Sequence, residues 1–94
     1  MSTNTVRDNR ERSRYELDTD RGRAFIDYRR SAGVVSLLHA EVPPSLRGGG
    51  IGSALVAGTL AIVRQQGERV VPRCPFVAIY IKRHPEFQDL LVSS

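Results

Sequence analysis

Hydrophobic and polar residues alternate over three stretches in the first half of the chain. The alternation runs through Arg14–Asp18, Ala24–Arg29 and Val34–Val42. A period of two residues predicts β-strands, and Gly22 and Gly33 fall in the short polar segments between them, where turns need conformational freedom. We therefore expect three antiparallel strands joined by tight turns.

The third strand carries residues of mixed character on both of its sides. Strict alternation places Val35, Leu37, His39 and Glu41 on one face, and Val34, Ser36, Leu38, Ala40 and Val42 on the other. Pro43 and Pro44 end the strand, because proline cannot donate a hydrogen bond to a neighbouring strand.

From about Gly50 the hydrophobic period becomes helical. One broad apolar face is expected from Ile51, Ala54, Leu55, Ile62 and Val63, and Gly67 ends the helix. A fourth strand over Glu68–Cys74 and a second helix over Pro75–Arg83 follow. Since strand–helix–strand connections are crossovers, the fourth strand should lie parallel to the third. The expected fold is a mixed α/β domain with the order β-β-β-α-β-α.

The first residues show no such periodicity. Residues 1–13 are therefore expected to form a flexible arm, and residues 14–94 a single small domain. The arm has no apolar segment typical of a secretory signal, and no apolar run approaches the roughly 20 residues of a membrane span. A lone cysteine excludes an internal disulfide and a multi-cysteine metal site, so we expect no metal and a reducing, cytoplasmic setting.

The charge balance leaves several classes of partner open. Fourteen Lys and Arg residues against ten Asp and Glu give a net charge of +4, which suits nucleic acid, an acidic partner or a phosphorylated ligand. Basic residues do not interleave with aromatic ones as in a nucleic-acid platform. Nucleic acid is therefore the less favoured partner.

Three consecutive glycines stand between the third strand and the first helix, in "EVPPSLRGGGIGSALVAG". Free amide groups at a helix N-terminus form an anion site, and glycine lets a phosphate approach closely. A flexible connector is the alternative. No Lys-Ser/Thr pair follows the glycines, so this is no nucleoside-triphosphate loop, and Ser53 breaks the dinucleotide-binding spacing.

The segment Arg47–Gly52 fits R-x-x-G-x-G and resembles the acyl-CoA pyrophosphate loop of the GNAT superfamily of N-acetyltransferases. The lead-in "HAEVPP" and the later "CPFVAIYIKRHPEF" resemble a minimal, single-domain branch of that superfamily, and the resemblance covers about residues 14–91. It implies that the two parallel strands splay apart around acetyl-CoA. The cofactor-binding residues implied in this way are Val42, Arg47, Gly48, Gly49, Gly50, Ile51, Gly52 and Ser53.

Four residues are candidates for the chemistry of acetyl transfer. His39 and Glu41 share a face of the third strand, and either could accept the proton of an amine. The resemblance implies that Tyr80 on the second helix protonates the departing thiolate, although it could equally be a packing residue. Cys74 precedes a helix N-terminus, which favours a nucleophilic thiolate, but a lone cysteine is more often a buried apolar residue.

The resemblance thus implies an N-acetyltransferase that passes the acetyl group of acetyl-CoA directly to a primary amine. Two alternatives are a non-catalytic acyl-CoA-binding or sensing module and a basic nucleic-acid-binding domain. The sequence does not identify the amine acceptor, the acyl preference or the oligomeric state.

Overall fold

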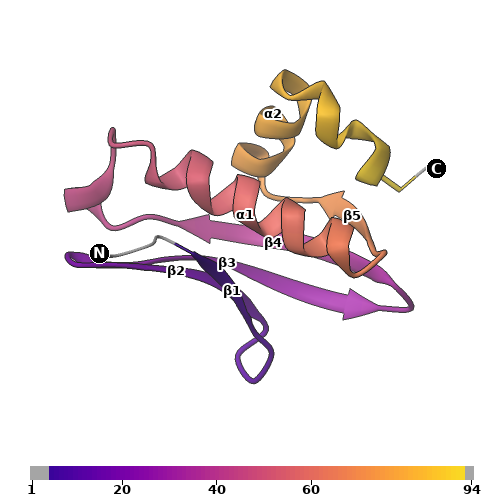
Figure 1. Cartoon of the computed structure of the whole chain (residues 1–94), viewed down its shortest axis with the longest axis horizontal. Coiled ribbons are helices and arrows are strands. Elements are labelled where there is room, and N and C mark those ends of the chain that lie inside the picture. The colour runs from indigo at the N-terminus through magenta and orange to yellow at the C-terminus, as the bar shows by residue number, and fades with distance from the viewer. Residues whose placement is uncertain (1–4, 93–94) are drawn as a thin grey trace.

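The computed structural model describes residues 5–92 as one five-stranded sheet with both helices packed on the same side of it (Figure 1). In chain order the elements are β1 (Val6–Asn9), β2 (Arg14–Thr19), β3 (Gly22–Ser31), β4 (Val34–Glu41), η1 (Pro44–Leu46), α1 (Ile51–Gln65), β5 (Arg69–Pro72), α2 (Pro75–Arg83) and η2 (Pro85–Leu90). The strands lie side by side in this order, β1 to β4 antiparallel and β5 parallel to β4. The expected α/β fold, with its meander and parallel crossover pair, is confirmed.

The core lies between the sheet and α1. The buried strand residues that build it include Tyr15, Leu17, Ala24, Ile26, Tyr28, Val35 and Leu37. No helix in the described part of the chain covers the opposite face of the sheet, whose side chains on β1 and β2 are charged or polar. None of the helices within residues 5–92 is both long and apolar enough to span a membrane.

The buried face of α1 differs from the expected one. Its buried residues are Leu55, Val56, Thr59, Leu60 and Val63, whereas Ala54 is exposed and Ile51 and Ile62 are only partly buried. The helix is therefore rotated relative to the predicted stripe. Thr59 has no exposed surface and belongs to the buried face. Because it is polar, a pattern based on apolar residues alone does not identify this face.

The expectation of a flexible arm over residues 1–13 is wrong for Val6–Asn9, which form β1 at the edge of the sheet. β1 pairs antiparallel with β2, with Val6 opposite Leu17. Several side-chain interactions hold the strand. Val6 is buried against α1, Arg7 donates a 2.7 Å hydrogen bond to the fully buried carboxylate of Glu16, and Asp8 accepts a 2.6 Å hydrogen bond from the Tyr28 hydroxyl. Residues 1–4 of the expected arm lie outside the described residues.

β1 packs on α1 because position 58 of the helix lacks a side chain. A Cβ atom added to Gly58 would lie 2.8 Å from the Cβ atom of Val6, closer than packed carbon atoms approach. The glycine is thus required for close approach of helix and strand.

We expect Gly58→Val to destabilise the protein by about 1–3 kcal/mol, because the added side chain forces β1 away from the helix. Urea denaturation measures the loss, and faster hydrogen exchange of residues 6–9 reports the detachment of β1. The matched control is Ala61→Val, which places the same side chain at an exposed position of the same helix. Equal urea midpoints for the two variants would contradict the prediction.

Candidate active site

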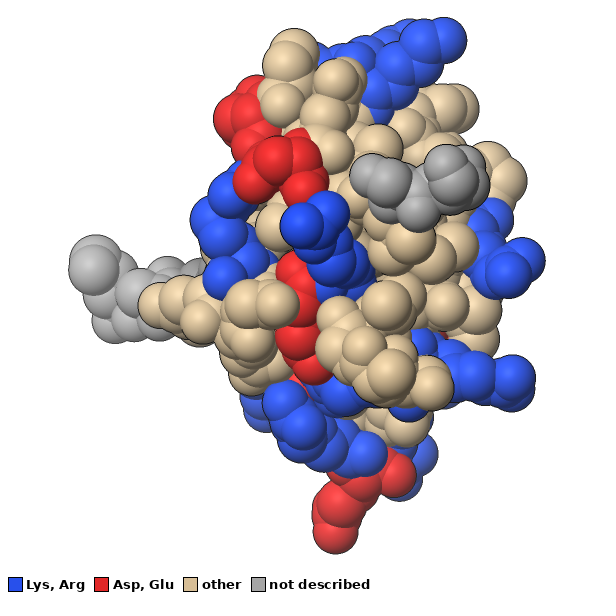
Figure 2. Space-filling model, turned by 90° about the vertical axis from the view of Figure 1, so that its right-hand side faces the viewer, with Lys and Arg blue, Asp and Glu red and all other residues tan. Residues whose placement is uncertain are grey.

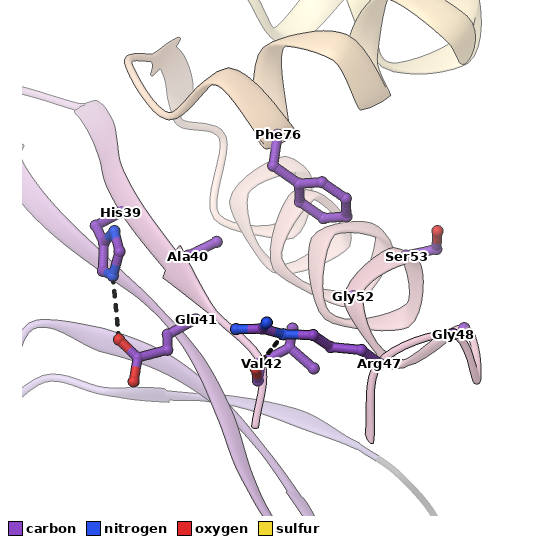
Figure 3. Close-up of a pocket in the computed structure, with 10 residues that line it drawn as sticks. His39, Ala40, Glu41, Val42, Arg47, Gly48, Gly52, Ser53 and Phe76 are labelled. Atoms are coloured by element: carbon purple, nitrogen blue, oxygen red, sulfur yellow. Dashed lines mark hydrogen bonds and ion pairs between the residues drawn. The ribbon is translucent and has the colours of Figure 1, made fainter. Parts of the chain in front are cut away.

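A cleft of about 640 Å³ opens where β4 and β5 separate (Figure 3). The last paired residues of the two strands are Leu37 and Pro72. Beyond them the Leu37 carbonyl accepts hydrogen bonds from the amides of Arg73 (3.0 Å) and Cys74 (2.9 Å), which turns the chain away into α2. β4 continues without β5 beside it, so its edge there faces the cleft.

Three segments line the cleft. They are His39–Val42 from β4 and the residue after it; Arg47, Gly48, Gly50, Gly52 and Ser53 from the loop and α1; and Phe76 from α2. Most residues predicted from the strand end and from the glycine loop are thereby brought together, whereas the predicted Gly49 and Ile51 are not among the residues that line the cleft.

A β-bulge in β4 decides which side chains reach the outer face. Leu37 pairs with Tyr28, but the next pair is His39 with Asp27, so Leu38 is an extra residue without a partner. The expected grouping of Val35 and Leu37 with His39 and Glu41 on one face is therefore wrong. The first two point into the core, and beyond the bulge the last two lie on the face away from the helices.

His39 and Glu41 lie next to each other on this outer face, as neighbours do on one side of a strand. The Nε2 atom of His39 lies 3.2 Å from Oε1 of Glu41. The exposed fractions of the two side chains are 60% and 58% respectively. Both side chains stand at the rim of the cleft (Figure 3). A substrate that enters from solvent can therefore reach this hydrogen-bonded acid–imidazole pair directly.

The glycine loop presents unpaired amide groups to the cleft. Gly48 and Gly50 have positive φ angles of 86° and 83°, and Gly50 is the N-cap of α1 without a side-chain cap. The amides of Gly48, Gly50, Ile51, Gly52 and Ser53 have no hydrogen-bond acceptor among residues 5–92. No acidic residue lies in the first helical turn, so the amides and the helix dipole together form an anion site.

Two of the predicted phosphate-binding amides are engaged within the protein. The amide of Arg47 donates to the Pro44 carbonyl at 3.3 Å, and that of Gly49 to the Leu46 carbonyl at 3.4 Å. The Arg47 side chain extends across the cleft and donates from Nε to the Val42 carbonyl at 3.1 Å (Figure 3). Its guanidinium group adds positive charge to the same site.

Tyr80 and Cys74 do not line this cleft. Tyr80 stacks on His84, with ring centroids 3.8 Å apart, beside a smaller hollow that shares Ser53 and Phe76 with the cleft. Burial, with a smaller contribution from the negative charge of Glu86, raises the pKa of Tyr80 above its usual value, so its hydroxyl stays protonated at neutral pH. Cys74 is the N-cap of α2 and its side chain is buried.

Phe76 is a cleft residue that was not predicted. Its ring packs so closely on α1 that a Cβ atom added to Gly52 would lie 2.9 Å from it. Phe76 as a whole nevertheless remains 45% exposed, because it also forms a wall of the cleft (Figure 3). The available signal was a large aromatic residue in the first turn of a helix, directly after the strand that borders the cleft.

The charged residues do not form one continuous basic surface on the face that Figure 2 shows, where acidic side chains lie between several of the basic ones. Several basic residues are paired in salt bridges, including Arg64 with Asp89 at 2.8 Å. Within residues 5–92 no cluster of three His, Cys, Asp or Glu residues could hold a metal ion.

Comparisons with known proteins agree with the fold. Residues 14–90 match the family model described as GCN5-related N-acetyl-transferase. The fold is similar to the solution NMR structure of a GCN5-like protein from Staphylococcus aureus, a candidate N-acetyltransferase. The TM-score is 0.73 at 20% identity, over 100% of this chain and 93% of that one. No curated protein matches the sequence at a significant level.

Proposed function

The chain belongs to the GCN5-related N-acetyltransferase family, and from this membership and the geometry of the cleft we propose that it binds acetyl-CoA and transfers the acetyl group to a primary amine. The observation that carries the proposal is the set of five unpaired amides at the start of α1, next to the open edge of β4. This combination offers a diphosphate site and an unpaired strand edge in one cleft.

The cofactor fits these features in a defined direction. Its pyrophosphate would accept hydrogen bonds from the free amides between Gly48 and Ser53, with Arg47 as a further cation. The pantetheine arm would run along Glu41 and Val42 and pair with the exposed edge of β4 as an added strand does. Phe76 would cover it from the side of α2.

The chemistry then follows from the groups at the rim. The His39–Glu41 pair takes a proton from the ammonium form of the acceptor, and the nitrogen lone pair attacks the thioester carbonyl carbon. The C–S bond breaks, the sulfur leaves as a thiolate, and the nitrogen releases its second proton to solvent as the neutral amide forms. Tyr80, which is protonated and lies beside the smaller hollow next to the cleft, is the proposed proton donor to the thiolate, and it regains a proton from solvent.

We propose direct attack and not an acetyl-cysteine intermediate, because the Cys74 thiol is buried and does not line the cleft. A non-catalytic acyl-CoA-binding module would need the amides but not the acid–imidazole pair. The presence of His39 and Glu41 in hydrogen-bonding contact at the rim therefore favours an enzyme.

Thermal denaturation with added ligand tests the proposal. A ligand that binds only the folded state at 100 times its Kd adds about 2.7 kcal/mol, which raises the Tm of a domain this small by on the order of 10 °C. We expect CoA and acetyl-CoA to raise the Tm, and ATP and NAD to have little effect. No shift with millimolar acetyl-CoA would refute the proposal.

A further inference from the structure

An aromatic side chain lies next to the proposed base on the uncovered face of the sheet. Phe25 of β3 is directly opposite Glu41 of β4, and its ring centroid is 6.5 Å from that of His39 in an edge-on arrangement. On its other side the guanidinium carbon of Arg14 lies 3.9 Å from the Phe25 centroid. Phe25 is thus flanked by a cation on one side and by the acid–imidazole pair on the other.

Arg14 keeps most of its hydrogen-bonding capacity. Its Nε atom donates to Oδ1 of Asp27 at 2.8 Å, while neither terminal nitrogen has an acceptor within residues 5–92. The side chain is 30% exposed. Contact with the ring and with Asp27 fixes the position of the guanidinium group.

Two other arginines on this face, Arg7 of β1 and Arg23 at the start of β3, are already paired with carboxylates. Arg7 and Arg23 both bind the buried Glu16 carboxylate, at 2.7 and 3.5 Å, and both also pair with Asp18. These two cations and two anions satisfy one another. Arg14 is therefore the cation next to Phe25 that retains donors for a ligand.

We infer that the acceptor is an amine that also carries a carboxylate or comparable anionic group, and that Arg14 binds this group while the amine reaches Glu41 and His39. The inference rests on the proposed function. Arg14 lies two strands from β4, or about 10 Å at the usual strand spacing, and its side chain leans back over Phe25. A chain of a few methylenes over the Phe25 ring would span the remaining distance.

This arrangement discriminates against polyamines. The second ammonium group of a diamine would be placed beside the terminal nitrogens of Arg14, where like charges repel, and the Asp27 carboxylate on the Nε side of the guanidinium offsets only part of this repulsion. A simple alkylamine would gain the ring contact alone. We therefore expect the preference to follow the charge at the far end of the acceptor: anionic, then neutral, then cationic.

The test compares three amines of equal chain length: δ-aminovalerate, pentylamine and cadaverine. Acetylation rates give kcat/KM, and NMR shifts of Phe25 and His39 in the CoA-loaded protein report binding independently of turnover. We expect δ-aminovalerate to exceed pentylamine roughly three- to tenfold, with cadaverine last. Arg14→Gln should remove this order, whereas Arg29→Gln, the same charge change on β3 at an exposed site, should preserve it.

The outcomes separate the two proposals. Equal responses to the three amines, a preference that survives Arg14→Gln, or no amine-dependent shift at Phe25 and His39 would each overturn the inference, even if acetyl-CoA raises the Tm. Failure of acetyl-CoA to bind overturns the proposed function itself. The Tm of Arg14→Gln with acetyl-CoA shows that the variant is folded and retains its cofactor site.

Discussion

Gly50→Glu is expected to raise the Kd for acetyl-CoA at least 100-fold, or about 3 kcal/mol, while the domain still folds. Nothing lies within 4 Å of the position that its Cβ atom would take, so the side chain fits the protein without a clash. The carboxylate, however, would stand among the free amides at the start of α1, where the cofactor's own negative charge must bind. Isothermal titration calorimetry with CoA measures the effect.

The matched control is Gly33→Glu, in the turn between β3 and β4. Gly33 also has a positive φ angle, 79° against 83° for Gly50, and also has no atom within 4 Å of an added Cβ. Both variants therefore carry the same backbone strain and the same added charge. Gly33→Glu should keep its affinity for CoA; a similar affinity loss in both variants would mean that strain, and not the anion site, is responsible.

Glu41→Gln is expected to lower kcat/KM for the amine by about 10²–10⁴-fold, the usual contribution of a general base. The amide side chain is nearly isosteric and remains near His39, but it cannot accept the proton. Since Glu41 does not contact the anion site, the Tm shift caused by acetyl-CoA should be unchanged. Initial rates at saturating acetyl-CoA give the comparison.

The double variant His39→Gln/Glu41→Gln distinguishes a pair that acts as a unit from two separate groups. Residues joined by a hydrogen bond in one proton-transfer step show non-additive losses, so the double variant should be little slower than the slower single variant. Glu11→Gln makes the same chemical change at an exposed position in the β1–β2 turn and should leave the rate unaffected. Full activity of the double variant would exclude both residues as the base.

The sequence predicts most of the fold because its elements follow simple periods. Alternation marked β2 and β3, proline ended β4, and glycines marked the turns and the end of α1. β1 was missed because a strand of four residues with a single apolar side chain, Val6, has no period to detect. Its stability depends on Gly58, which is distant in sequence, and on the ion pair of Arg7 with Glu16 on the neighbouring strand.

The candidate site was predictable where it is formed by local backbone and not where it depends on tertiary packing. The anion site in the loop from Arg47 to Ser53 is formed by the backbone of its glycines, which the sequence shows directly. Which amides are free, however, depends on η1, because its carbonyls accept hydrogen bonds from the amides of Arg47 and Gly49. Phe76 enters the cleft only because α2 packs against Gly52, a contact between elements that no local pattern reveals.

The bulge at Leu38 decides which side chains at the end of β4 face solvent. If Leu38 paired regularly with Asp27, His39 would lie opposite Ile26, and the two sides of everything beyond Leu37 would be exchanged. His39 and Glu41 would then lie beneath α1, where desolvation is costly, and Ala40 and Val42 would move to solvent. We conclude that one residue left outside the pairing keeps two ionisable groups in water and two apolar ones against the core.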